Sequence, residues 1–417
     1  MRALALLVLV VAGAAFAEEA PLRRALALAC EDAGAAALAQ ALDAHIETDE
    51  ALAFGGVTLG WRRRLGLADG GLVVTRIAPF GTLRRVEVER RATTPPRPEA
   101  LLVAGPDCTP IAARRLRYGA DGRAEAIEIL GPDLAPVAVE PLDPPVPAGR
   151  DPGGVTVALV DSGVNYRLPA IAAALARDSD GRALGYDFWD LDPRPFDADP
   201  SRSPFFPRRH GTRVASVLLR EGPAVRLIPY RYPRPDPARW AALIADAAAK
   251  GARIVVLPMG SRTRAPWGRV AEAVTAHPEV LFVVSAGNEG RDIDREPVYP
   301  ASFRLANMLV VSSADGLGNP APGANWGKST VDLLVPGERI PVTRFDGSPG
   351  TASGASFAAP RLAALAARLA LANPDWGTAD LIAALIARAR MTDAAGPPTS
   401  RYGFLDSGPL GTPGSSP

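Results

Sequence analysis

Four polar side chains in the second half of the chain have the types needed for nucleophilic acyl transfer: Asp161, His210, Asn288 and Ser356. A serine hydroxyl becomes a useful nucleophile when a general base, most often histidine, takes its proton. The base in turn needs a carboxylate that fixes its tautomer. An amide side chain can stabilise the negative charge that develops on the attacked oxygen. The four residue types therefore predict acyl-transfer chemistry, provided that the fold brings them together.

Each of these signals is weak when taken alone. Ser356 lies in "GTASGASFAAP", a run of small residues in which a serine usually serves close helix packing. His210 begins a predicted helix, where an exposed polar residue is common, and Asp161 ends a strand, where aspartate often caps a loop. The other two histidines are weaker candidates for a base, because His45 lies in the N-terminal region and His277 precedes a proline at a helix end.

From residue 155 onward, apolar runs rich in valine and isoleucine alternate with helical patterns. The predicted strands are 155–160, 225–230, 253–259, 280–286 and 308–313, and the helices between them are 211–219, 236–249 and 266–276. This alternation predicts an α/β fold with a buried parallel sheet and right-handed crossovers. Active sites of such sheets lie beyond the carboxyl ends of the strands. Asp161 and Asn288 follow strands, whereas His210 and Ser356 begin helices, so we expect the four residues at one edge of the sheet.

The motifs around the four residues resemble those of the subtilisin-like serine proteases. They are "VALVDSGVN", "HGTRVAS", "VVSAGNEG" and "SGASFAAP". The chain order Asp, His, Ser is that of subtilisin, and the resemblance covers residues 151–406. It implies a subtilisin-like fold and a serine endopeptidase that hydrolyses polypeptides through an acyl-enzyme. By that resemblance Asp161, His210 and Ser356 form the catalytic triad, and Asn288 with the Ser356 backbone stabilises the oxyanion.

The resemblance also implies that the stretch "LPMGS" from Leu257 binds the substrate backbone as an added strand. The candidate substrate-binding residues are Met259, Gly260, Ser285, Ala286 and Gly287. The chain departs from the family pattern at Arg213, Ser216, Pro258, Ala355 and Phe357. These departures leave open a second interpretation, a catalytically silent protein that binds peptides or a partner. An α/β-hydrolase esterase does not fit, because the G-x-S-x-G motif is missing around Ser356 and the residue order differs.

The stretch "DFWDLDPRPFDADP" from Asp187 carries five aspartates. The family often binds structural calcium through carboxylates and backbone carbonyls, so this stretch is one candidate calcium site. It lacks a recognisable ligand spacing, and a solvated acidic loop is the alternative. The implied chemistry requires no cofactor and no catalytic metal.

The N-terminal 17 residues predict a secretory signal peptide, with one arginine, an apolar run and a small-residue ending before Glu18. The apolar run is too short to span a bilayer, so we expect an exported periplasmic or extracellular protein without a membrane span. Cys30 and Cys108 can pair in an oxidising compartment, although "LALAC" ending at Cys30 faintly resembles a lipoprotein box. A net charge of +1 argues against electrostatic binding of nucleic acid.

Residues 18–140 predict a small α+β domain with a helical region at 21–44 and strands at 71–77, 83–90 and 124–130. A proline-rich linker at 141–152 separates it from a peptidase-like domain at 153–406, and a flexible tail follows at 407–417. Relatives often carry an N-terminal prosegment, so the resemblance implies that this domain is an inhibitor or folding chaperone of the chain's own peptidase domain. A permanent accessory domain is the alternative.

Overall fold

The computed structural model describes residues 20–234, 236–391 and 399–406. The chain divides into two compact units. The first unit comprises Met1–Asp143 and Pro200–Pro207, and the second comprises Pro144–Asp199 and Arg208–Pro417. The predicted signal peptide and the predicted tail at 407–417 lie outside the described residues.

The second unit is built on a seven-stranded parallel sheet with the strand order β10-β11-β9-β12-β13-β14-β15. The strands are β9 (Val155–Asp161), β10 (Tyr186–Asp187), β11 (Val225–Arg231), β12 (Ile254–Leu257), β13 (Leu281–Ser285), β14 (Met308–Ala314) and β15 (Leu333–Pro336). The predicted parallel sheet is therefore confirmed, with β10 and β15 as strands that the apolar pattern did not predict. Because β9, β12 and β13 run parallel as neighbours, their carboxyl ends meet at one edge.

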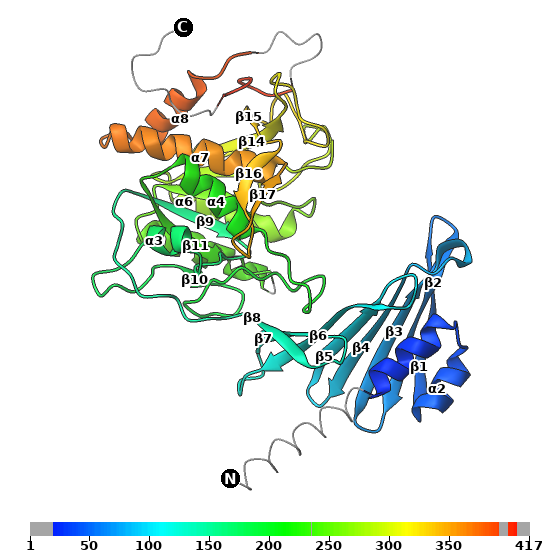
Figure 1. Cartoon of the computed structure of the whole chain (residues 1–417). Coiled ribbons are helices and arrows are strands. Elements are labelled where there is room, and N and C mark those ends of the chain that lie inside the picture. The colour runs from blue at the N-terminus through cyan, green and yellow to red at the C-terminus, as the bar shows by residue number, and fades with distance from the viewer. Residues whose placement is uncertain (1–19, 235, 392–398, 407–417) are drawn as a thin grey trace. The chain divides into compact units, whose positions relative to one another are not determined.

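Helices cover both faces of this sheet (Figure 1). They are α3 (Pro169–Ala174), α4 (Gly211–Glu221), α5 (Trp240–Ala249), α6 (Gly268–Ala276), α7 (Ala355–Ala372) and α8 (Thr378–Ile386). Alternate strand residues point to opposite faces, so Val157 and Leu159 share a core with α4 and α7, whereas Ala158 and Val160 share one with α5 and α6. Among the described residues, α7 alone has the length and apolar character of a membrane span, and 72% of that stretch is buried inside the protein. It is the central helix of the core.

The first unit contains an eight-stranded antiparallel sheet in which the strands follow one another in chain order (Figure 1). They are β1 (His45–Phe54), β2 (Val57–Leu67), β3 (Gly70–Ile77), β4 (Arg85–Thr93), β5 (Pro96–Ala104), β6 (Pro110–Tyr118), β7 (Ala124–Leu130) and β8 (Pro136–Pro141). A helix over residues 20–30 and α2 (Ala35–Leu42) pack on one face, where Leu22 and Leu38 meet Leu72 and Leu102. The domain is α+β as predicted, but the sheet is much larger than three strands and the helical region is two helices.

A disulfide between Cys30 and Cys108 joins the end of the first helix to the turn before β6. Their Cα atoms lie 6.0 Å apart, which is within the range that a disulfide spans. The thiol of Cys30 is therefore engaged in this bond, which disfavours the lipoprotein alternative.

The segment after β8 lies along the second unit rather than hanging free. The carbonyl oxygen of Pro144 accepts a hydrogen bond from the Tyr166 hydroxyl (2.5 Å), and that of Pro147 accepts one from the Arg177 guanidinium (2.8 Å). Asp151 forms an ion pair with Arg226 (2.7 Å). The predicted proline-rich linker is thus held at several points by the second unit.

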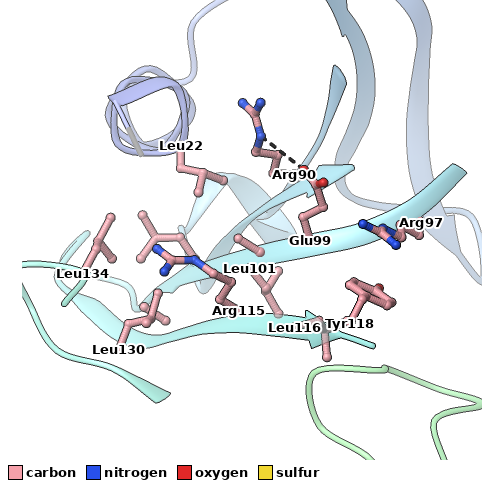
Figure 2. A pocket seen from close by; sticks show the side chains of 13 residues that line it. Leu22, Arg90, Arg97, Glu99, Leu101, Arg115, Leu116, Tyr118, Leu130 and Leu134 are labelled. Carbon is pink, nitrogen blue, oxygen red and sulfur yellow. Dashed lines mark ion pairs between the residues drawn. The ribbon is translucent and has the colours of Figure 1, made fainter. Parts of the chain in front are cut away.

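A cavity of about 230 Å³ lies between the helix over residues 20–30 and the sheet of the first unit (Figure 2). Leu22, Leu130 and Leu134 line it together with strand residues. Its arginines already have partners: Arg90 pairs with Asp69 and Glu99, Arg115 with Glu128, and Arg97 stacks over Tyr118. Apolar and charged side chains therefore line the cavity together, and Nε of Arg97 is buried without a hydrogen-bond partner among the described residues.

Candidate active site

Asp161 and His210 form a hydrogen-bonded pair at the carboxyl end of β9. Asp161 is the last residue of this central, buried strand and is 2% exposed. Both of its carboxylate oxygens lie 2.8 Å from Nδ1 of His210, the residue directly before α4. Burial lowers the pKa of His210, but the charge and hydrogen bond of Asp161 raise it more, so this pKa lies above its usual value of 6.5. The pair therefore holds the imidazole with its Nδ1 proton toward Asp161 and leaves Nε2 for proton transfer.

A buried hydroxyl and a buried carboxylate fix this pair in place. The Ser162 hydroxyl donates to Asp197 (2.6 Å) and accepts hydrogen bonds from the backbone N–H groups of His210 (3.3 Å) and Gly211 (3.0 Å). Asp197 is fully buried and also accepts from the backbone of Thr212 (2.9 Å). Burial raises the pKa of Asp197, against hydrogen bonds that lower it. The sequence assigned no role to Ser162, although it lies in the "DSG" motif, and Asp197 was considered only as part of the aspartate-rich stretch.

The aspartate-rich stretch is bound into the protein and is not the solvated loop that the sequence suggested. Arg231, at the end of β11, forms ion pairs with Asp187 (2.8 Å) and Asp190. Asp187 is 2% exposed, and burial raises its pKa to about 6. Asp199 accepts from the Tyr232 hydroxyl (2.6 Å). Within the described ranges, no group of three or more His, Cys, Asp or Glu side chains is arranged to hold a metal ion.

Ser356 is the second residue of α7, and its hydroxyl lies at the edge of the same site. The hydroxyl donates to the carbonyl oxygen of Pro258 (3.1 Å), the residue that follows β12. Pro258 and His210 line the same cavity, described below. In the described part of the chain no hydrogen bond joins Ser356 to His210, an arrangement that is common when substrate is absent. The Ser356 N–H belongs to the first turn of α7, whose donors have no partner inside the helix.

Asn288 follows β13 and is oriented by the start of α7. Its Oδ1 accepts a hydrogen bond from the backbone N–H of Ala355 (2.8 Å), while its Nδ2 has no hydrogen-bond partner among the described residues. Gly354 has φ +125°, and a Cβ atom there would lie 2.8 Å from Oδ1 of Asn288. Glycine is therefore required for this close approach. Two donors, Nδ2 of Asn288 and the N–H of Ser356, remain available for a developing oxyanion.

The side chain of Asn325 fixes the turn around Asn288 through hydrogen bonds to the residues on both sides of it. It is fully buried, and its Nδ2 donates to the carbonyl oxygen of Ala286 (2.8 Å) and to Glu289 (2.6 Å). Its Oδ1 accepts from the backbone N–H groups of Glu289 and Arg291, both at 3.0 Å. Local sequence did not indicate this role for Asn325, because its partners are 34 to 39 residues away.

A cleft of about 790 Å³ opens beside Asp161 and His210. Its walls come from the segments after β9, β11 and β12 and from helices α4 and α5, and include Arg208, Arg213, Tyr232, Arg234, Trp240, Pro258, Met259, Gly260 and Trp267. Its size is that of a typical ligand pocket. The cleft therefore offers both apolar rings and arginine charges to a bound chain.

The predicted substrate-binding residues occupy two different environments. Met259 and Gly260 line the cleft. Ser285 and Ala286 are buried at the end of β13, where the Ser285 hydroxyl accepts a hydrogen bond from the N–H of Gly287 (3.2 Å). The first two can reach a ligand directly, whereas the other three shape the base of the site beside Asn288.

The departures from the family pattern are accommodated in the structure. Phe357 is 5% exposed and its ring centroid lies 5.8 Å from that of His210. The Ser216 hydroxyl donates to the carbonyl oxygen of Arg213 (2.7 Å) and accepts from the N–H of Thr343 (2.9 Å). Arg213 lines the cleft with its Nε donating to the carbonyl oxygen of Arg209 (3.0 Å). None of these side chains displaces His210 or Ser356.

Comparison with known proteins shows where this arrangement recurs. A family model for the subtilase family matches residues 153–404. A thermophilic serine proteinase of Bacillus sp. (strain AK1) is 30% identical over 232 residues, which cover 52% of this chain and 52% of the relative. Thermitase of Thermoactinomyces vulgaris is 26% identical over 231 residues, covering 52% of this chain and 75% of thermitase.

Alkaline serine exoprotease A of Vibrio alginolyticus is 30% identical over 271 residues, which cover 61% of this chain and 46% of that protein. This chain therefore spans about half the length of the Bacillus and Vibrio relatives. Among solved structures, a cold adapted subtilisin-like serine proteinase superposes with a TM-score of 0.51 at 26% identity, covering 64% of this chain and 93% of that chain.

Proposed function

The chain belongs to the subtilase family, and from this premise we propose that it is an exported serine endopeptidase. The observation that carries the proposal is the pairing of Asp161 with His210 at the edge where Asn288 meets the start of the Ser356 helix. The substrate is a polypeptide, and the chemistry requires no cofactor. Export rests on the predicted signal peptide and is consistent with the Cys30–Cys108 disulfide.

In the proposed reaction the Ser356 hydroxyl turns from Pro258 toward Nε2 of His210 and gives up its proton as Oγ attacks the peptide carbonyl carbon. Asp161 stabilises the imidazolium that forms without itself taking the proton. The tetrahedral intermediate then collapses, the C–N bond breaks, and His210 delivers the proton to the leaving amine. Water, deprotonated by the same imidazole, attacks the acyl-enzyme and releases the acid product and free Ser356.

The segment after β12 is suited to bind the substrate backbone as an added strand. Ser261 pairs with Tyr299 through two backbone hydrogen bonds (2.9 and 2.8 Å), whereas the N–H and C=O groups of Met259 and Gly260 have no backbone partner among the described residues. Pro258 has no N–H to offer, but its carbonyl oxygen faces the Ser356 hydroxyl. The proline therefore leaves the acceptor beside the nucleophile intact.

We expect Asn288→Ala to lower kcat for peptide cleavage by about 10²–10³-fold, the loss measured for one oxyanion donor in subtilisin. KM should change little, because Nδ2 of Asn288 is needed only when negative charge develops in the transition state. Steady-state kinetics on one chromogenic peptide measure both constants. Asn319→Ala, outside the cleft, is the matched control and should keep both; a loss confined to KM would contradict the oxyanion role.

The rival function is a catalytically silent protein that binds peptides or a partner. It is favoured by the hydrogen bond of the Ser356 hydroxyl to Pro258 in place of His210. Incubation of the purified protein with casein separates the two functions. Casein fragments whose amount increases with time support the endopeptidase, whereas intact casein at every pH between 6 and 10 supports the rival function.

The resemblance to the family leads us to propose that the N-terminal domain acts on the peptidase domain of its own chain, as an inhibitor or a folding chaperone, and a permanent accessory domain is the alternative. Structural calcium remains part of the proposal only as an expectation from the family, since its ligands are not identified among the described residues.

A further inference from the structure

The first unit contains a short segment, residues 200–207, that comes from the middle of the peptidase sequence. Phe205 of this segment is 1% exposed. It forms one apolar cluster with Leu101 and Val103 of β5, Leu116 of β6 and Ile127 of β7. Leu102, between the two β5 residues, belongs to the cluster under the helices. Phe205 therefore covers the sheet face opposite to the one that the two N-terminal helices cover.

Polar contacts hold the same segment. The Arg114 guanidinium donates to the carbonyl oxygen of Phe205 (2.9 Å) and lies 4.2 Å from the centroid of the Phe206 ring. The backbone N–H of Phe206 also donates to the Ser203 hydroxyl (3.3 Å). A buried aromatic side chain, a hydrogen bond to a charged group and a cation–π contact together bind residues 200–207 specifically to the N-terminal sheet.

The two ends of the segment are fixed in the second unit. Asp199 and Arg208 form an antiparallel bridge with two backbone hydrogen bonds of 3.1 and 2.9 Å. Arg208 lies two residues before His210 in sequence, and both line the cleft. The chain therefore passes between the two units three times, at 143/144, 199/200 and 207/208.

We propose that the N-terminal domain is a permanent part of the protein. After the linker is cut, the contacts between residues 200–207 and the N-terminal sheet retain it. A prosegment that departs would leave Phe205 and Phe206 side by side in water. Burial of Phe205 opposes this, because exposing a large aromatic side chain is unfavourable. The inference goes beyond the proposed function and holds whether or not the protein cleaves peptides.

The test uses the full chain with Ser356→Ala, which prevents self-digestion, and a recognition site for a highly specific protease inserted at Arg150. Residues 148–150 are exposed, and the disulfide lies within the N-terminal fragment, so it does not join the two products. After complete cutting, size-exclusion chromatography and native mass spectrometry should show a 1:1 complex of the two fragments at micromolar concentration.

Phe205→Ala in the same cut protein should raise the dissociation constant by roughly two orders of magnitude or more, as expected for removing a buried phenylalanine. The matched control is Phe54→Ala, because Phe54 is 80% exposed in the same unit; it should leave the complex unchanged. Circular dichroism before cutting shows that each variant is folded. Fragments that separate without any substitution, or a Phe205→Ala complex as tight as the control, overturn the proposal.

Discussion

We expect Ser356→Ala to remove casein cleavage, with kcat reduced by about 10⁶-fold, the size of the loss for the corresponding serine in subtilisin. The reason is that the alanine side chain cannot form the acyl-enzyme, and the remaining oxyanion donors accelerate only the slow direct attack of water. Binding should persist, because the cleft walls formed by Met259, Gly260 and Trp267 are unchanged. The measurement is initial-rate proteolysis of casein and of one chromogenic peptide by both proteins.

Ser353→Ala provides the control for this substitution. Ser353 lies three residues before Ser356, is exposed, and its hydroxyl only accepts a hydrogen bond from the N–H of Arg339 (2.9 Å). This variant should cleave at close to the wild-type rate. Equal cleavage by Ser356→Ala and wild type would mean that the activity belongs to another residue or to a contaminating protease.

Asp161→Asn should lower kcat/KM at neutral pH by about 10⁴-fold, as the equivalent change does in a serine protease triad. The amide N–H₂ of asparagine can donate to Nδ1 of His210, which favours the tautomer with its proton on Nε2. The imidazole is then unable to accept the Ser356 proton. Nδ1 of His210 lies 2.8 Å from both carboxylate oxygens, so the residue at position 161 directly determines the tautomer of the imidazole.

The same variant should also change the pH dependence of kcat/KM. Burial lowers the pKa of His210, and the Asp161 charge outweighs that effect and raises it above 6.5. The base must be neutral, so wild-type activity should be lost as pH falls through a pKa above 6.5. Without the carboxylate, the effect of burial dominates and the pKa of His210 falls. The pH at which kcat/KM is lost on the acid side should therefore be lower. Asp180→Asn, on an exposed residue, should keep the wild-type profile, and an unchanged acid-side pH dependence in Asp161→Asn would contradict the pairing.

Local sequence patterns predicted the parallel sheet and the residues at its edge because each carries its signal nearby. The run "VTVALV" is uniformly buried in β9, and Asp161 follows it directly. His210 and Ser356 stand at the starts of α4 and α7 as the helical patterns indicated. Continuous apolar strands and small-residue helix starts are short-range features, so one sequence is enough to read them.

Features set by distant partners were not predictable in this way. The aspartate-rich stretch reads as solvated because nothing local shows that Arg231, Ser162 and Thr212 will enclose Asp187 and Asp197. The N-terminal sheet was underestimated because β1 ("HIETDEALAF") is mostly exposed and lacks an apolar alternation. The Gly55-Gly56 turn that pairs β1 with β2 was the available signal.

The packing of Phe205 on the N-terminal sheet was also not predictable from the local sequence. "SPFFP" has the composition of an ordinary loop, and its partners in β5, β6 and β7 lie about 80 to 100 residues away. Only the folded chain brings them together.

The intact mass of the purified protein after treatment with a serine-reactive fluorophosphonate, beside Ser356→Ala, tests the assignment of the nucleophile most directly. We predict one adduct on the wild-type protein and none on the variant, with both masses beginning at Glu18 if the signal peptide is removed. An adduct on both proteins, or none on a wild-type chain whose linker has been cut, would contradict Ser356 as a nucleophile activated by His210. No adduct on the full-length chain alone would instead indicate inhibition by the N-terminal domain.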